Sequence, residues 1–192
     1  MNKIVTVGYG EVKKVQIGGT LPLAFVGGPC AIENRDHAMF MADSIATICD
    51  KLDIPWIYKS CYDKDCRSSP KSFHGVGIDQ GLKILSEVRE TYKVPVVSDF
   101  SDSSWAAATG EVCDMVQVPA YLCRQTSILK AAAATGRPIL LKKGQFMSPW
   151  NMKNSCRKLE AFGNEQIILA DRGTFMGYNM LVNDMTSFPI MS

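Results

Sequence analysis

Two stretches decide the fold of this chain: PILLKKGQFMSPW, residues Pro138 to Trp150, and QIILADRG, residues Gln166 to Gly173. Each opens with an apolar run of strand length and ends in cationic residues just before a glycine or the start of a helix. Enzymes built on barrels of parallel strands place their chemistry at such strand ends. The two stretches therefore predict buried strands that deliver charged side chains to a common site.

Four more strand-like runs precede these two. They are Leu23–Cys30, Pro55–Ser60, Pro95–Phe100 and Asp114–Ala120. Between the runs lie segments with helical apolar spacing, such as His37–Leu52 and Gly81–Tyr92. This alternation predicts a parallel sheet covered by helices, either a doubly wound sheet or a (β/α)8 TIM-type barrel. Polar residues at the strand ends favour the barrel, here with about six βα units.

One polar side chain stands at the carboxyl end of each run, where a barrel would bring all of them together. In chain order these are Cys30, Lys59, Asp99, Gln117, Lys142 and Arg172. Lysine and arginine suit a substrate that carries both carboxylate and phosphate groups. The alternative is that these cations reach solvent or pair with Asp99 and Asp171.

Two further segments carry groups suited to phosphate. The loop DKDCRSS, residues Asp63 to Ser69, places Lys64, Arg67 and Ser68 together after the second run. The alternative for this loop is a polar surface turn. Arg124 stands at the start of a predicted helix, whose free N–H groups also attract phosphate.

The seven cysteines contain no CxxC pair, so the sequence predicts neither a zinc ribbon nor a disulfide framework. Cys30 follows a Gly-Gly-Pro turn at a strand end, where a thiolate can bind a divalent metal. A free thiol is the alternative, because one cysteine does not make a metal site. The two histidines, His37 and His74, do not stand at strand ends.

With 192 residues, 46% of them apolar, and a net charge of +2, the chain suits one globular domain over residues 1–192. IVTVGYG and EVKKVQIGG, within residues 1–20, predict an antiparallel hairpin that closes the amino-terminal end of the barrel. No block of like charges favours nucleic acid or a membrane surface. We expect a cytoplasmic protein, because neither a membrane span nor the apolar core of a signal peptide stands out.

The chain resembles the 3-deoxy-8-phosphooctulonate synthase family from about Val15 to Ser192. The motifs are GGPCAIE, YKSCYDKDCRSSPKSFHGVG, QVPAYLCRQTSIL, LLKKGQFMSPWNMKN and LADRGTFMGYNMLVNDMTSFPIM. Their density favours this family over the related 3-deoxy-arabino-heptulosonate 7-phosphate synthases. The resemblance implies a (β/α)8 barrel that condenses phosphoenolpyruvate with arabinose 5-phosphate and releases inorganic phosphate, in the biosynthesis of a lipopolysaccharide precursor.

The resemblance also implies roles for the residues above. Phosphoenolpyruvate would be held by Lys59, Lys142 and Arg172, with Asp99 and Gln117 beside them. Arabinose 5-phosphate would face Lys64, Arg67 and Ser68, and Arg124 would complete a phosphate site near a subunit boundary. Cations in a water-poor pocket offset the repulsion between two phosphorylated substrates. Family members are usually tetramers, so we expect a homo-oligomer.

Cys30 matches the metal-dependent branch of that family. There the cysteine binds zinc, iron(II) or manganese together with a histidine, a glutamate and an aspartate on the seventh and eighth strand ends. This sequence stops just after its sixth βα unit, so we expect a partial barrel that lacks those ligands and has an open side. An oligomer or a second fragment would have to cover that side.

The chain departs from the family pattern in the sugar-phosphate loop and the site wall, which puts the acceptor sugar in doubt. The departures are Cys61, Cys66, Pro70, Lys71 and Ser101. The first hypothesis is therefore a synthase of this family. The alternatives are a catalytically silent protein that binds phosphorylated ligands or a partner, and an incomplete product that does not fold alone.

Overall fold

Six parallel strands form the central sheet of the computed structural model, which describes residues 3–192. The strands pair in chain order. They are β3 (Phe25–Gly27), β4 (Trp56–Lys59), β5 (Val96–Asp99), β6 (Met115–Val118), β7 (Ile139–Lys142) and β8 (Ile167–Ala170). All six predicted runs are thus strands, each shorter at its ends than the apolar run that contains it.

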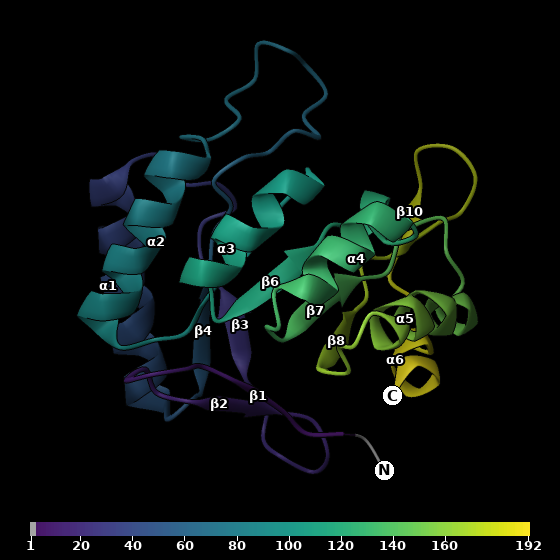
Figure 1. The fold of residues 1–192 in the computed structure, drawn as a ribbon, viewed down its shortest axis with the longest axis horizontal. Helices are drawn as coiled ribbons and strands as arrows, with labels where there is room; N and C mark the ends of the chain where they lie inside the picture. Colours follow the sequence, from purple (N-terminus) through teal and green to yellow (C-terminus); the bar gives the residue numbers. More distant parts are fainter. Residues whose placement is uncertain (1–2) are drawn as a thin grey trace.

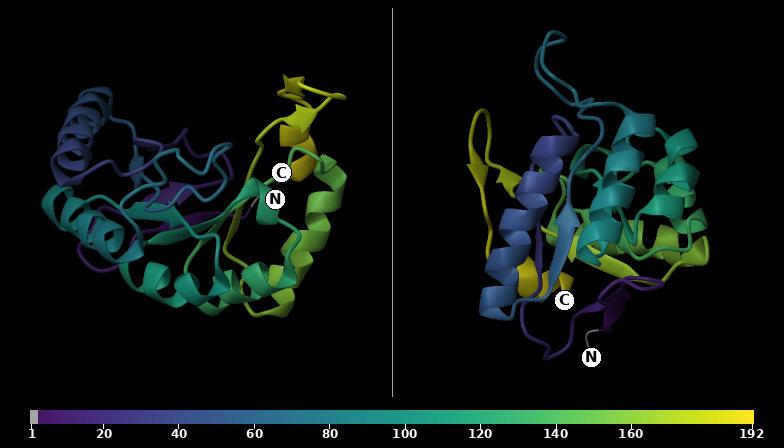
Figure 2. Two further views of the ribbon diagram at one scale, coloured as in Figure 1. Left: turned by 90° about the horizontal axis from the view of Figure 1, so that it is seen from above. Right: turned by 90° about the vertical axis from the view of Figure 1, so that its left-hand side faces the viewer.

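Helices cover only the convex face of this sheet. They are α1 (Arg35–Leu52), α2 (Ile78–Tyr92), α3 (Ala106–Val112), α4 (Thr126–Ala134) and α5 (Met152–Ala161), with 3-10 turns η1 (Ser103–Trp105), η2 (Ala120–Leu122) and η3 (Pro149–Asn151). The sheet curls inside this layer and stays open on one side (Figure 1; Figure 2, left). A doubly wound sheet would carry helices on both faces. The prediction of a barrel-type fold of about six βα units is therefore confirmed, as a half-barrel.

Local sequence sets the helix ends. α1 starts after Asn34, whose side chain accepts a hydrogen bond of 2.8 Å from the backbone N–H of His37. It ends at Asp53, whose φ of 51° lies in the left-handed region. The helix thus begins two residues before the predicted His37, because the capping side chain precedes the apolar pattern.

Residues on the strands alternate between two cores, as the period of two requires. One core lies between sheet and helices and includes Ile139 and Leu141 of β7. The other lies on the concave side of the sheet. Its buried members are Val7, Val15, Ile57, Val97, Met115 and Leu140.

The amino-terminal hairpin closes the bottom of the concave core. β1 (Val5–Val7) and β2 (Val15–Ile17) pair antiparallel and contribute Val7 and Val15 to that core. Figure 1 shows the hairpin across the lower end of the strands, opposite the long β4–α2 loop. The hairpin therefore lies where the sequence predicts it.

A buried carboxylate fastens the hairpin to the barrel. Asp114 accepts hydrogen bonds from Arg89 Nε (2.9 Å) and Nη2 (3.1 Å), from the backbone N–H of Tyr9 (3.0 Å) and from that of Val96 (3.0 Å). The guanidinium carbons of Arg89 and Arg137 lie 4.1 Å and 3.6 Å from the centre of the Tyr9 ring. Groups from the hairpin, α2 and β5 thus meet at the Asp114 side chain.

The carboxyl-terminal segment projects from the open side of the half-barrel. It contains a small antiparallel pair, β9 (Thr174–Phe175) with β10 (Leu181–Val182), and the short helix α6 (Ser187–Met191). Many of its apolar side chains are exposed, and Tyr178 is 99% exposed, whereas Met191 packs against the core between sheet and helices. No helix within residues 3–192 is long and apolar enough to cross a membrane.

Candidate active site

The polar residues at the strand ends form a layer directly above the concave core. Each follows a core residue by two positions, which places it on the same face of its strand. The pairs are Ile57 with Lys59, Val97 with Asp99, Met115 with Gln117 and Leu140 with Lys142. The register pairs Asp99 of β5 directly with Gln117 of β6.

Two lysines approach the carboxylate of Asp99 from the β4 side. The ammonium of Lys64 lies 3.4 Å from Asp99 Oδ2, and the Lys59 ammonium donates to Cys61 Sγ at 3.3 Å. Gly28, in the turn after β3, lets the backbone there approach β4 closely, because a Cβ at that position would collide with the backbone oxygen of Lys59.

The charges of these groups act on one another. Burial would raise the pKa of Asp99, but Lys59 and Lys64 outweigh burial and hold that pKa below its ordinary value. Burial lowers the pKa of Lys142, and the charge of Lys59 lowers it further. The pKa of Lys64 is raised, because Asp99 and Cys61 outweigh the effect of burial. Three ammonium groups therefore share one carboxylate, and the site carries excess positive charge.

Three buried oxygens at or just after the strand ends have no hydrogen-bond partner among the described residues. They are Asp99 Oδ1, Gln117 Oε1 and Gln145 Oε1. Gln117 and Gln145 are 1% and 3% exposed, and buried polar atoms are nearly always paired. Such atoms are suited to a ligand or to water. Sequence reasoning missed Gln145, although its position three residues after β7, in KKGQ, was a usable signal.

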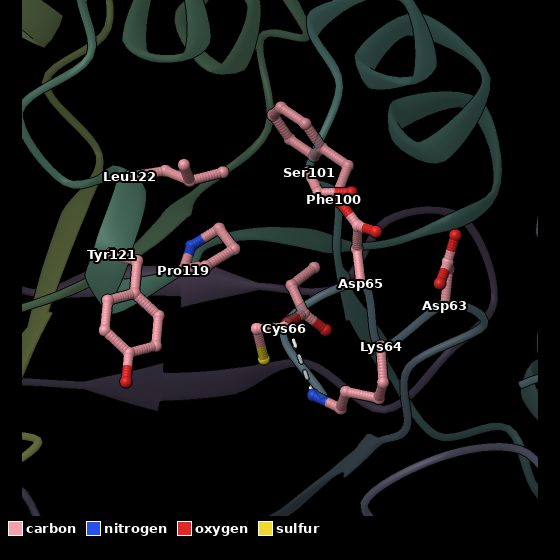
Figure 3. Close-up of a pocket in the computed structure, with 10 residues that line it drawn as sticks. Asp63, Lys64, Asp65, Cys66, Phe100, Ser101, Pro119, Tyr121 and Leu122 are labelled. Atoms are coloured by element: carbon pink, nitrogen blue, oxygen red, sulfur yellow. Dashed lines mark hydrogen bonds and ion pairs between the residues drawn. The ribbon is translucent and has the colours of Figure 1, made fainter. Parts of the chain in front are cut away.

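A cavity of about 130 Å³ opens beside this cluster, between the β4–α2 loop and the turns after β5 and β6. Lys64 lies at its edge, and a dashed line in Figure 3 marks the ion pair of Lys64 with Asp99. Phe100, Pro119 and Leu122 form an apolar wall. An apolar wall with a few converging charged groups is typical of small-molecule sites.

The other predicted site residues are exposed, and among residues 3–192 their side chains make no hydrogen bond or ion pair with this cluster. Arg67 and Ser68 are exposed in the β4–α2 loop, and Arg172 is exposed after β8. Arg124 is exposed and lines a separate cavity of about 260 Å³ with Asn151, Asn154 and Lys158.

The sequence left open that the cations at the strand ends only pair with Asp99 and Asp171. Asp99 does form an ion pair with a lysine, Lys64. Asp171 does so as well, but the partner there is Lys143 at 3.2 Å, a residue that sequence reasoning did not single out.

The residues described do not make up a metal site. Cys30 is exposed, and within residues 3–192 no three histidine, cysteine, aspartate or glutamate side chains come together as metal ligands. Cys61 lies in the site wall, where burial and then the charge of Asp99 raise the pKa of its thiol. We therefore derive no chemical step through a metal.

A curled parallel sheet with cationic side chains at the carboxyl ends of its strands defines the class: an α/β-barrel protein. Residues 4–192 match the DAHP synthetase I family. The chain is 47% identical to a protein of Rickettsia rickettsii (strain Sheila Smith), 46% to one of Rickettsia bellii (strain OSU 85-389) and 47% to one of Rickettsia conorii. Each of these alignments covers the whole chain and 68% of the relative.

Each of these relatives is named 2-dehydro-3-deoxyphosphooctonate aldolase. The chain belongs to the DAHP synthetase I family.

Proposed function

We propose that this protein condenses phosphoenolpyruvate with arabinose 5-phosphate, giving 3-deoxy-octulosonate 8-phosphate and inorganic phosphate. The relatives' name supports the reaction class. The observation that carries the proposal is the convergence of Lys59, Lys64 and Lys142 on Asp99 at the carboxyl ends of the strands. A site with excess positive charge suits two phosphorylated substrates, which repel each other in water.

The reaction forms a carbon–carbon bond between C3 of phosphoenolpyruvate and the aldehyde carbon of the sugar, while water adds at C2 and phosphate leaves. Negative charge grows on the aldehyde oxygen as the bond forms. Lys59 and Lys142 are half-buried cations, and cations held in place beside the reacting groups stabilise such charge. We assign phosphoenolpyruvate to Lys59, Lys142 and Arg172, with Asp99 and Gln117 beside it.

The sugar phosphate belongs at the rim under this proposal. Lys64 lines the cavity beside the cluster, and Arg67 and Ser68 follow it on the exposed loop. Arg124 would serve a phosphate from its separate position. Cys30 stays the proposed contribution of this chain to a divalent metal whose remaining ligands lie elsewhere.

The test measures inorganic phosphate released from phosphoenolpyruvate, with and without arabinose 5-phosphate, with zinc, manganese or iron(II) added in turn. We expect sugar-dependent release that Lys142→Met removes. Lys153→Met is the matched control, because Lys153 is exposed on α5. Sugar-independent release, or equal loss in the control, contradicts the assignment.

A second candidate function is a silent binder of phosphorylated ligands. It is favoured by one observation: Arg172 is exposed, so its guanidinium is open to solvent. Phosphoenolpyruvate would then raise the melting temperature without any phosphate release. Turnover by the folded protein rules this candidate out.

We also propose a homo-oligomer in the cytoplasm, with the open side of the half-barrel covered by a second copy. A folded monomer of 21.1 kDa should expose about 9,000 Å², whereas this chain exposes 10516 Å². The excess exceeds the roughly 800 Å² that each partner contributes to a standard interface. Sedimentation velocity tests this: a single species of 21.1 kDa at micromolar concentration contradicts it.

A further inference from the structure

Lys143 is a fully buried lysine beside the proposed site. Its side chain is 0% exposed, although lysine is almost never fully buried unless it is paired. It follows Lys142 directly, and successive residues of a strand face opposite sides. Lys142 therefore faces the site, while Lys143 continues the outer face of Ile139 and Leu141.

The ammonium of Lys143 gathers acceptors from two loops. In the segment after β8 it donates hydrogen bonds to the Gly173 carbonyl at 2.8 Å and to Thr174 Oγ1 at 3.1 Å, and it forms an ion pair with Asp171 Oδ1 at 3.2 Å. Its own loop contributes the carbonyls of Gly144 and Met147, both at 3.4 Å. An ammonium has three protons, and the four hydrogen-bond acceptors named here are enough for all of them.

These contacts fix the position of the residues on both sides of Arg172. Asp171 is held through Oδ1 by Lys143 and accepts a hydrogen bond from the Gly173 N–H through Oδ2 at 3.0 Å. The Gly173 carbonyl is held by the same ammonium. Gly173 has a φ of 84°, which favours glycine, so the turn that follows Arg172 is tightly specified.

We propose that Lys143 is a positioning residue that holds Arg172 in register with Lys142, so that both cations bind the carboxylate or phosphate of one anion. This inference rests on the proposed function, since it assigns that anion to phosphoenolpyruvate. Groups that bind ligands depend on a supporting shell of this kind for their orientation. Lys143 does not touch the ligand.

The test uses the double variant Lys143→Met with Asp171→Leu, which removes both charges and leaves neither buried without a partner. Its control is Lys153→Met, an exposed lysine on the neighbouring helix. We expect the dissociation constant for phosphoenolpyruvate, measured by calorimetry, to rise at least tenfold in the double variant and to stay unchanged in the control. The KM for phosphoenolpyruvate should rise while that for the sugar phosphate does not.

Amide hydrogen exchange over residues 171–175 gives a readout that needs no ligand. We expect faster exchange there in the double variant, and unchanged exchange in the strands β4 and β5. Wild-type affinity in a folded double variant, or unchanged exchange at 171–175, overturns the inference. Failure of the wild-type protein to bind phosphoenolpyruvate overturns the proposed function instead, and exchange alone then decides whether Lys143 holds the loop.

Discussion

Replacing Asp114 by alanine should destabilise the fold severely, because this carboxylate is fully buried and accepts four hydrogen bonds. Its loss leaves Arg89 Nε and the N–H groups of Tyr9 and Val96 without an acceptor, while Arg89 Nη2 keeps only the Tyr9 carbonyl. Removing one partner of a buried ion pair costs about 3–5 kcal/mol. With a urea slope of about 2 kcal/mol per M, the unfolding midpoint should fall by about 2 M.

Urea unfolding followed by far-UV circular dichroism measures this loss. Glu11→Ala is the control: Glu11 pairs with Lys93 at 3.4 Å but its side chain is 88% exposed, so its midpoint should not move. A double-mutant cycle with Arg89→Ala should show strong coupling between Arg89 and Asp114. A fall of less than about 1 kcal/mol in Asp114→Ala would refute the reasoning, since an unpaired buried donor alone costs that much.

Three further outcomes follow from the site and its loops. The pKa of Asp99 is lowered in the folded state, so its charge stabilises the fold above about pH 3.9. That contribution is lost as pH falls through the folded pKa. The stability difference between wild type and Asp99→Asn, from urea titrations at several pH values, should therefore shrink below about pH 4. Lys59→Met should raise the pKa of Lys142 in an NMR titration of lysine side chains, because Lys59 helps to depress it; an unmoved pKa would mean that the two ammonium groups are apart. Gly173→Ala should cost about 1–2 kcal/mol for its left-handed φ, and more for a clash, because a Cβ would lie 2.9 Å from Leu181 Cδ1. The control Gly177→Ala should cost less, because Gly177 has a φ of 73° and no atom within 4 Å of its Cβ position. Equal melting temperatures for the two variants would contradict the close contact at Gly173.

The parallel sheet and most of the site layer could be predicted from sequence. The sheet follows from the alternation of apolar runs and helical segments, and the site layer follows from the period of two along each strand. An inward-facing apolar residue two positions before Lys59, Asp99, Gln117 or Lys142 places that polar residue on the same face, and parallel strands bring such faces together. No interaction between distant residues needs to be known for this step. The resemblance to a known family then supplied the reaction that the charges alone left open.

The sequence did not predict which cations would lie in the site, which would be buried elsewhere and which would be exposed. Lys142 and Lys143 are adjacent and identical, yet one reaches the site and the other is buried against Asp171 and Gly173. Alternation separates their faces, but burial of Lys143 depends on the path of the chain after β8. Arg172 continues the inward face of Ile168 and Ala170, and it is nevertheless exposed, because β8 lies at the open edge of the sheet.

The site and the amino-terminal hairpin are mechanically linked through the concave core. Ile57, Val97 and Leu140 support the site layer from below, and Val7 and Val15 of the hairpin support them in turn. In a half-barrel no strands pack against this small core from the open side, so its packing depends more on the hairpin at its lower end. Loosening the hairpin at Asp114 should therefore weaken ligand binding at the opposite end before the helices unfold.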